Sequence, residues 1–532
     1  MPFRPDIEGL RALAVLFVLI WHAGVPWLPG GFIGVDVFFV VSGFLMTSIL
    51  HREQIASRRG MVNVGEFYAR RARRLVPASL LTLIATAIAT FVILPETRWR
   101  DIGFDIAAAG GYLVNWRLAD RAVDYLQQDA AASPIQHFWS LSVEEQFYVF
   151  WPLLLVGIAV LVRLIRFSIT KATFAGLALI AVASLAWSSY LTDAEPGRAY
   201  FVTTTRLWEL AIGGLVALAL PSLAKLPMSI AAAFAWIGLA SIVGTGFLLT
   251  TTVPFPGMVA LIPTVGAALV IASGPAAGPY GPIRMCTNRL VLWIGGCSYS
   301  IYLWHWPFIV IGGYWVTEGL RETSVTEGVG LALLSVLPAW LSLRFVENPL
   351  RRSEELIESV RKSLTLAFLG IAVSLVAGLL LASLTPRPAP TNYISKYVPP
   401  PGVEKEPFGA EVLGDNPVES PAALVGAIDV ISPSPQAAPD DNPAIYLDGC
   451  HLSFEETEPR FCDYGDLSSS VEVAVVGDSH AAQWLPALQS VALDRAWKLK
   501  VSTKSSCPYL GIAVLSNTGR PCWPSFGMTT MG

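Results

Sequence analysis

The stretch RPDIEGLRALAVLFVLIWH, from Arg4 to His22, joins the length of a membrane helix to two ionisable side chains. A helix needs about 20 mostly apolar residues to cross the hydrocarbon core of a bilayer. Arg11 and His22 share one face of such a helix, about 16 Å apart along its axis. Because ionisable groups at membrane depth are costly, they indicate function. The alternative is that His22 is a core histidine bonded to a neighbouring helix.

The composition extends this interpretation to the whole chain. Of the 532 residues, 53% are hydrophobic and only 14% are charged, whereas a soluble domain has roughly 25% charged residues. A chain with so little charge cannot cover itself with a solvated surface, which excludes the soluble globular and disordered classes. A net charge of −4 also argues against a nucleic-acid binder. We therefore expect a polytopic α-helical membrane protein with a soluble appendage.

Hydrophobic runs predict eleven membrane spans. They are Leu10–Val25, Phe32–Leu50, Leu75–Leu94, Leu141–Val162, Ala172–Tyr190, Val202–Leu220, Ile230–Leu249, Met258–Ile271, Leu290–Gly313, Gly328–Phe345 and Leu364–Leu384. The apolar stretch Ala107–Trp116 is too short to span, and we expect a re-entrant or interfacial piece there.

Basic residues predict the orientation, because cytoplasmic loops are enriched in Lys and Arg. The loop after the second span and the alternate loops that follow it hold 17 of these residues, whereas the opposite loops hold six. The N-terminus is therefore expected in the cytoplasm, and everything after Leu384 outside.

The outer part begins with a stretch rich in proline, with 13 Pro between Pro386 and Pro443, which is typical of an extended linker. A soluble stretch from about Tyr446 follows. Its four cysteines suggest disulfides formed in an oxidising compartment. Three pairings are open, and the local ones, which close short loops, are preferred: Cys450 with Cys462, and Cys507 with Cys522. Cys286 and Cys297 are expected to be free thiols.

Charged groups at the span ends permit a functional and a structural interpretation. The cluster Arg70, Arg71, Arg73 and Arg74 is a cytoplasmic anchor, a phosphate site, because guanidinium pairs bidentately with phosphate, or both at once. Glu144 and Glu145 are explained by the positive end of a helix dipole, and since adjacent residues face different ways, at most one of them faces a given cavity. Arg206 and Glu209 are expected to form an intrahelical ion pair. Tyr302 and His305 lie in an aromatic run that is compatible with an interfacial belt.

Taken together, seven stretches resemble the integral-membrane acyltransferase family 3, bacterial O-acyltransferases that modify envelope glycans. In chain order they are RPDIEGLRALAVLFVLIWH (Arg4–His22), GGFIGVDVFFVVSGFL (Gly30–Leu45), FYARRARRLVPA (Phe67–Ala78), HFWSLSVEEQFYVFWP (His137–Pro152), RLWELAIGG (Arg206–Gly214), SYSIYLWHWP (Ser298–Pro307) and FVENPLR (Phe345–Arg351).

This resemblance implies ten core spans, with an eleventh leading to a soluble domain. It also implies that a cytoplasmic acyl-CoA, most simply acetyl-CoA, gives its acyl group to a hydroxyl of an envelope glycan or glycolipid outside the bacterial inner membrane. The family's motifs place a catalytic role on His22 and donor binding on Arg11, Arg70, Arg71 and Arg74. Glu145 and His305 are further catalytic candidates, and Asp36, Glu144, Arg206, Glu209 and Tyr302 are other motif residues.

The segment VEVAVVGDSHAAQWLPAL, Val471 to Leu488, predicts a strand, a tight turn and a helix. It resembles the first block of SGNH hydrolase-like domains, which makes Ser479 the candidate nucleophile beside Asp478 and His480. The later Asp-x-x-His block, which supplies the general base in that family, does not occur in the 52 residues after His480. We therefore expect an incomplete α/β domain that does not complete SGNH catalysis.

The expected organisation is an acyltransferase domain at 1–352, a cytoplasmic segment with the eleventh span at 353–385, a linker at 386–445 and the partial SGNH-like domain at 446–532. The partners expected are the bilayer and an envelope glycan or glycolipid, with no nucleic acid. No metal-ligand spacing is present. The competing function is a transporter or flippase of a lipid-linked sugar or acyl donor, because polytopic form and intramembrane charges fit that class too.

Overall fold

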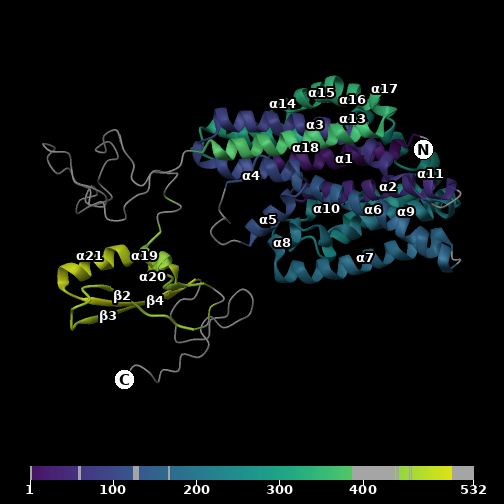
Figure 1. The fold of residues 1–532 in the computed structure, drawn as a ribbon. Helices are drawn as coiled ribbons and strands as arrows, with labels where there is room; N and C mark the ends of the chain where they lie inside the picture. Colours follow the sequence, from purple (N-terminus) through teal and green to yellow (C-terminus); the bar gives the residue numbers. More distant parts are fainter. Residues whose placement is uncertain are drawn as a thin grey trace. The chain divides into compact units, whose positions relative to one another are not determined.

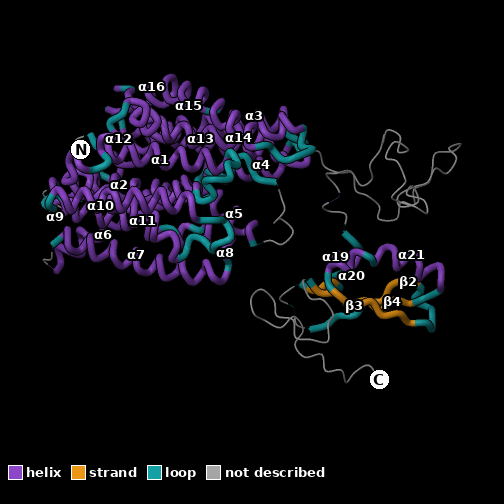
Figure 2. Tube along the Cα trace, turned by 180° about the vertical axis from the view of Figure 1, so that it is seen from behind, coloured by secondary structure: helices purple, strands orange, loops and turns teal. Residues whose placement is uncertain are grey.

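The computed structural model describes residues 3–57, 61–123, 131–165, 168–385, 438, 442–453, 456 and 458–505. The chain separates into two compact units, Met1–Thr385 and Pro386–Gly532. The first is a bundle of long helices and the second contains a small sheet with helices (Figures 1 and 2). The expected linker lies almost entirely outside the described residues.

The helical unit consists of α1 (Pro5–His22), α2 (Gly34–Ala56), α3 (Val64–Ile93), α4 (Trp99–Gly110), α5 (Val114–Ala122), α6 (Phe138–Ile165), α7 (Ile169–Ala194), α8 (Pro196–Phe201), α9 (Leu207–Leu223), α10 (Met228–Leu248), α11 (Leu261–Ala277), α12 (Ile283–Cys286), α13 (Arg289–Thr317), α14 (Val325–Leu334), α15 (Val336–Ser342), α16 (Asn348–Arg352), α17 (Glu354–Ile357) and α18 (Val360–Ser383). Short 3-10 turns join several of them, and the π-helical segment η7 (Leu343–Glu347) joins α15 to α16.

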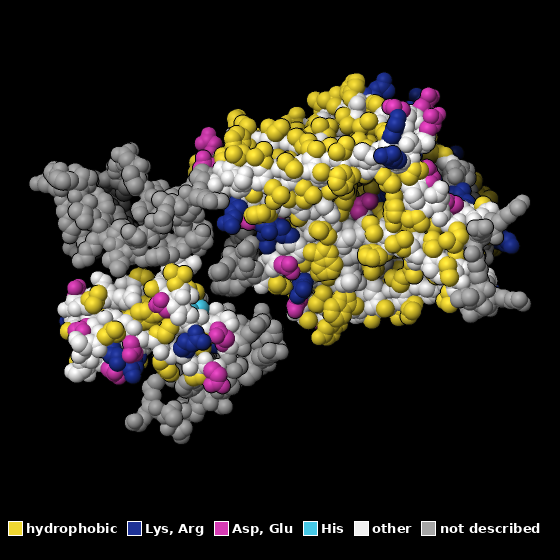
Figure 3. Space-filling model, viewed as in Figure 1, with side chains coloured by type: hydrophobic (Ala, Val, Ile, Leu, Met, Phe, Trp, Pro, Cys, Tyr) yellow, Lys and Arg dark blue, Asp and Glu magenta, His cyan; other side chains and the backbone are white. Residues whose placement is uncertain are grey.

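Among the described residues, seven helical segments are long and apolar enough to cross a membrane, and two shorter apolar helices accompany them. Each of the eleven predicted spans overlaps a helix or a continuous helical run, although the number that cross the bilayer stays a prediction. The face of this unit seen in Figure 3 is predominantly hydrophobic. The short stretch Ala107–Trp116 is broken, since α4 ends at Gly110 and α5 starts at Val114.

Helix α1 packs against both α2 and α13, the two helices that carry most of the site described below. Its start is fixed by Arg4, which pairs with Asp6 at 2.5 Å and donates to the Ile271 carbonyl of α11 at 2.7 Å. Helices α2 and α9 approach backbone to backbone at two glycines. A Cβ on Gly43 would lie 1.9 Å from the Leu210 carbonyl oxygen, and one on Gly213 would lie 2.1 Å from that of Val40. Small residues at such contacts are typical of membrane helix pairs.

The second unit holds α19 (Ala444–Leu447), β1 (His451–Leu452), β2 (Cys462–Gly465), β3 (Glu472–Gly477), α20 (Ser479–Gln483), α21 (Leu485–Arg495) and β4 (Lys498–Lys504). Strand β4 is central: it pairs in parallel with β3 and β1 and antiparallel with β2. The expected strand, turn and helix around Gly477 are present as β3 and α20.

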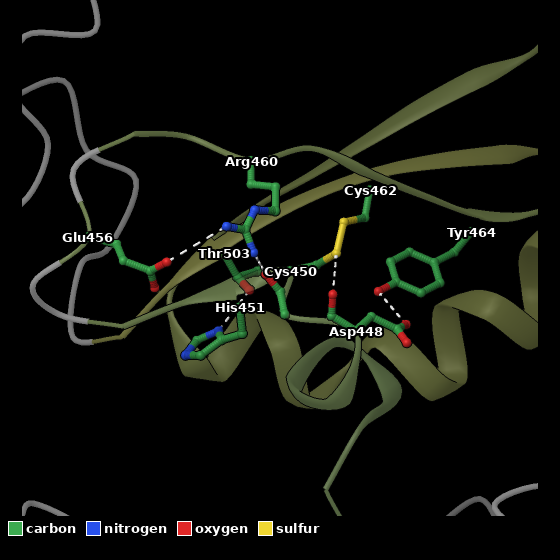
Figure 4. The surroundings of a disulfide bond; sticks show 9 residues. Asp448, Cys450, His451, Glu456, Arg460, Cys462, Tyr464 and Thr503 are labelled. Carbon is green, nitrogen blue, oxygen red and sulfur yellow. Dashed lines mark hydrogen bonds and ion pairs between the residues drawn. A yellow bond between two sulfur atoms is a disulfide. The ribbon is translucent and has the colours of Figure 1, made fainter.

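A disulfide joins Cys450 to Cys462, the local pairing expected from the sequence (Figure 4). It ties the start of β2 to the residue before β1. Nearby, the Tyr464 hydroxyl donates to Asp448 at 3.0 Å. Cys507 and Cys522 lie outside the described residues, whereas Cys286 and Cys297 are free thiols, as expected.

Candidate active site

Two histidines from distant parts of the sequence meet at the end of α1. His22 is the last residue of α1, and its Nδ1 lies 2.9 Å from Nε2 of His305 on α13. The two rings stack with centroids 5.1 Å apart, and Trp306 packs against His22 from the same helix. His305 is fully buried, so its interpretation as a member of an interfacial belt is wrong.

The hydrogen-bond partners determine which nitrogen of each histidine carries a proton. Nδ1 of His305 lies 2.7 Å from the Tyr302 carbonyl, which can only accept, so the Nδ1 of His305 carries the proton. Neutral His305 therefore presents the lone pair of Nε2 to His22. His22 must donate from Nδ1, which leaves its Nε2 lone pair free to act as a base.

A third histidine, which the motif analysis did not assign to the site, packs against this pair. His137 donates from Nε2 to the Leu303 carbonyl at 3.0 Å, and its ring lies 5.4 Å from that of His305 and 5.5 Å from that of Tyr302. The Tyr302 hydroxyl donates to the His137 carbonyl and lies 2.6 Å from the Ser140 hydroxyl. The sequence offered one clue to this role: His137 is the first residue of the stretch His137–Pro152, and His305 lies in the stretch Ser298–Pro307.

A cavity lies between α1, α2, α3, α6 and α13. One end is basic, with Arg11, Arg71 and Arg74 in its wall. The other end carries Phe38, Ser140 and Tyr302. Since the Tyr302 ring lies 5.4 Å from that of His305, this second end adjoins the histidines. The cavity is thus basic at one end and aromatic and hydroxylic at the other.

Helical phase divides the arginine cluster of α3 into two pairs. Arg71 and Arg74, three residues apart, line the cavity, whereas Arg70 does not and instead pairs with Glu53 and Glu66 at 3.4 and 3.5 Å. Arg73 is buried and donates to the Leu356 carbonyl and the Ser363 hydroxyl. The structure therefore brings Arg11, Arg71 and Arg74 together and leaves Arg70 on another face.

The cavity arginines differ in how they are neutralised. Arg11 pairs with Glu8 at 2.9 Å, and Arg71 pairs with Glu145 at 2.8 Å while lying over the Tyr148 ring. Arg74 forms no hydrogen bond or ion pair with any residue in the described part of the chain. Its guanidinium is therefore available to an anion that enters the cavity.

Both acids of α6 have defined positions, and only one lines the cavity, as the alternation of helix faces predicts. Glu144 lines the wall and accepts from the Ser42 hydroxyl at 2.8 Å, whereas Glu145 holds Arg71. The two carboxylates lie in the second turn of α6, so their side-chain partners account for them more directly than the helix dipole does. Ser42, which the sequence did not indicate, follows the α2 stripe of Val35 and Phe38 that faces the cavity.

Arg206 and Glu209 form the expected ion pair at 2.9 Å, and Asp36 of α2 joins it at 3.0 Å. All three are at most 1% exposed. Arg206 also packs against the rings of Trp139, Tyr200 and Phe255. This group joins α2 to α9 and does not line the cavity, so its geometry is that of a structural element.

In the second unit, Ser479 is the first residue of α20, directly after the turn at Gly477. Asp478 caps that helix by accepting from the His480 backbone N–H at 2.9 Å. The His480 side chain is 70% exposed, and its Nδ1 lies 3.4 Å from Asp478. No described histidine hydrogen-bonds to Ser479, so the described residues do not assemble a serine–histidine pair.

Comparisons with known proteins match both units to protein families. The family model described as an acyltransferase domain matches residues 4–344, and that described as an SGNH domain fused to such domains matches 439–526. The protein named "Putative O-acetyltransferase SAS0844" of Staphylococcus aureus (strain MSSA476) is 33% identical over 362 residues, covering 66% of this chain and 58% of that protein. O-acetyltransferase OatA of S. aureus (strain NCTC 8325 / PS 47) is 32% identical, covering 66% and 57%. This chain thus spans less than two thirds of the relatives it matches, and no solved structure matches it significantly.

Proposed function

Because the chain belongs to the acyltransferase family whose domain matches residues 4–344, we propose that it is a membrane O-acyltransferase. The donor is a cytoplasmic acyl-CoA, most simply acetyl-CoA, and the acceptor is a hydroxyl of an envelope glycan or glycolipid outside the bacterial inner membrane. The N-terminus lies in the cytoplasm and the second unit outside. Residues 1–352 form the domain that transfers the acyl group, and residues 353–385 contain the eleventh span. Residues 386–445 form the linker, and residues 446–532 form the outer domain.

One observation carries the proposal: the arginine-lined cavity ends beside the histidine pair. Coenzyme A combines anionic phosphates with a long, thin pantetheine arm. Arg74, which forms no hydrogen bond or ion pair with a described residue, and Arg71 offer guanidinium groups at the basic end. From Arg11 to His22, α1 spans about 16 Å, so an extended arm can place its thioester near the histidines. The acyl group would reach His22 past Tyr302, which stands at the far end of the cavity.

In the proposed reaction His22 is the general base. Its free Nε2 takes the proton of the acceptor hydroxyl while the oxygen bonds to the thioester carbonyl carbon. The carbon–sulfur bond breaks, and the proton returns to the leaving thiolate, giving free coenzyme A and an ester. His305 acts through His22, because the hydrogen bond between them leaves the Nε2 of His22 unprotonated. Ser479 takes no part in this membrane step.

The test uses membrane vesicles with the cytoplasmic face exposed, given radiolabelled acetyl-CoA. Label is followed into alkali-labile esters on envelope glycans. His22→Ala is compared with His51→Ala, since His51 is a buried histidine of α2 that bonds to Gln54 and Thr170 instead. The proposal predicts a loss of about 10²-fold or more for His22→Ala and near-normal transfer for His51→Ala at equal protein levels. Equal transfer by both variants, or passage of intact labelled donor without ester formation, would overturn it.

A further inference from the structure

A groove on the helical unit belongs to no part of the proposed reaction. It runs between α13 and the continuous run α15–η7–α16. One wall is formed by Trp293 and Gly296 of α13, and the other by Trp340, Arg344 and Arg351. None of these residues lines the donor cavity.

The far wall is a regular stripe. Trp340, Arg344, Asn348 and Arg351 follow one another at intervals of four, four and three residues, so they share one helix face. The stripe crosses η7, a π-helical segment, and such segments are frequent at functional sites. The groove is therefore apolar at the Trp340 end and basic at the Arg351 end.

The arginines at the basic end form no ion pair with a described residue, although the buried Glu347 attracts Arg351 electrostatically. Arg344 and Arg351 are exposed, and neither forms a hydrogen bond or ion pair with another described residue. The nearest acid of the same run, Glu347, is buried and accepts from Ser300 of α13 at 3.0 Å. It therefore faces the bundle, and no acidic side chain lines the groove.

The apolar end is open to the surroundings of the bundle. Trp340 at this end is 40% exposed, and Trp293, which lies near the start of α13 and so toward the basic end, is 41% exposed. A Cβ on Gly296 would meet no atom within 4 Å, so this glycine forms the hollow floor between the two helices. Because α13 begins at Arg289 and α16 ends at Arg352, the basic end lies on the side of the membrane that the charge distribution predicts to be cytoplasmic.

We infer that this groove is a binding site for an anionic glycerophospholipid. The lipid phosphate lies at Arg344 and Arg351, and an acyl chain lies over Gly296 between the two indoles. Basic pockets between membrane helices on the cytoplasmic side are suited to anionic headgroups, and each Lys or Arg near such a surface contributes about 1 kcal/mol. The site requires that the helices cross a membrane, and it does not depend on the acyl-transfer proposal.

The charge arm of the test titrates the purified full chain in detergent with phosphatidylglycerol or phosphatidylethanolamine and counts bound lipid by native mass spectrometry. Phosphatidylglycerol should bind more tightly. Arg344→Gln and Arg351→Gln should each weaken it about fivefold, the factor that corresponds to about 1 kcal/mol, whereas phosphatidylethanolamine should change little. Arg284→Gln, an exposed arginine of α12 outside the groove, should stay within about twofold of the parent chain.

A second pair of variants tests the shape of the groove by filling its floor without changing any charge. Gly296→Leu should weaken both lipids, whereas Gly244→Leu, whose Cβ also meets nothing within 4 Å, should not. Equal losses for Arg284→Gln and Arg344→Gln would show diffuse charge attraction and overturn the site. Equal binding of the two lipids would also overturn the site. Displacement of phosphatidylglycerol by coenzyme A would overturn it too, because it would assign the groove to the acyl donor.

Discussion

At the scale of single residues, the proposed reaction depends on the hydrogen bond between His22 and His305. His305 is held by the Tyr302 carbonyl, so it accepts from His22 and leaves the outer nitrogen of His22 unprotonated. A neutral imidazole with one nitrogen anchored and the other free is a suitable general base. In the proposed reaction His305 is therefore a positioning residue for His22.

This role predicts different results for two substitutions of His305. His305→Leu removes the acceptor and should lower kcat about 10²-fold, with KM for the donor little changed. His305→Gln keeps an amide oxygen that can accept from the Nδ1 of His22, so it should recover part of the rate. Steady-state transfer in vesicles measures both constants. Identical kcat values for the two variants would argue against tautomer control and leave His305 a packing role.

At the scale of elements, the contact between α2 and α9 places Asp36 beside Arg206 and Glu209 and holds one wall of the cavity. Gly43→Ala should destabilise the protein by about 1–3 kcal/mol, since the added carbon would collide with the Leu210 backbone and helices repack at that cost. Thermal unfolding of the detergent-solubilised chain measures the effect. Gly244→Ala, which has open space around it, is the matched control. An unchanged Tm for Gly43→Ala would show that the two backbones are not in close contact.

The sheet of the second unit contains a pH-sensitive element. His451 on β1 contacts the Thr503 hydroxyl (Figure 4). It also contacts the Ser505 hydroxyl, and its ring packs at a tilt against that of Tyr446. Partial burial lowers the pKa of His451 below its usual value, an effect that nearby Asp478 opposes. The unfolded chain therefore binds a proton more readily than the folded chain, and stability is lost as the pH falls through the ordinary histidine range near 6.5.

Acidification from pH 7.5 to 5.5 should accordingly speed hydrogen exchange in β1 and β4 of the full chain, after correction for intrinsic rates. His451→Gln should remove this dependence. His480→Gln, at a 70% exposed side chain, should retain it. Full pH dependence in His451→Gln would place the responsible group elsewhere.

The helices and the site differ in how far the sequence predicts them. Hydrophobic runs mark the helices, and short spacing predicts local pairs such as Arg206 with Glu209 and Cys450 with Cys462. Contacts across helices carry no such signal: nothing in the chain order places His305 beside His22, or Asp36 beside Arg206. The family resemblance grouped Arg70 with Arg71 and Arg74, whereas helical phase turns Arg70 to another face.

At the scale of the whole molecule, the proposed reaction gives the two ends of α1 separate tasks. The Arg11 end of α1 shares the cavity with Arg71 and Arg74, and the His22 end meets α13. Such a division suits a donor that enters from one side of a membrane and an acceptor that approaches from the other. It also predicts that donor binding and chemistry can be damaged independently.

The most direct test of this division measures binding of a non-transferable thioether analogue of acetyl-CoA to the purified full chain, together with transfer from acetyl-CoA. Arg74→Gln should weaken analogue binding about tenfold, as expected for the loss of a charge-assisted phosphate contact, whereas Arg70→Gln, outside the cavity, should bind normally. His22→Gln should bind the analogue as well as the parent chain does while transfer falls about 10²-fold or more. Normal binding by Arg74→Gln, or a joint loss of binding and transfer in His22→Gln, would contradict the separation of donor site and catalytic base.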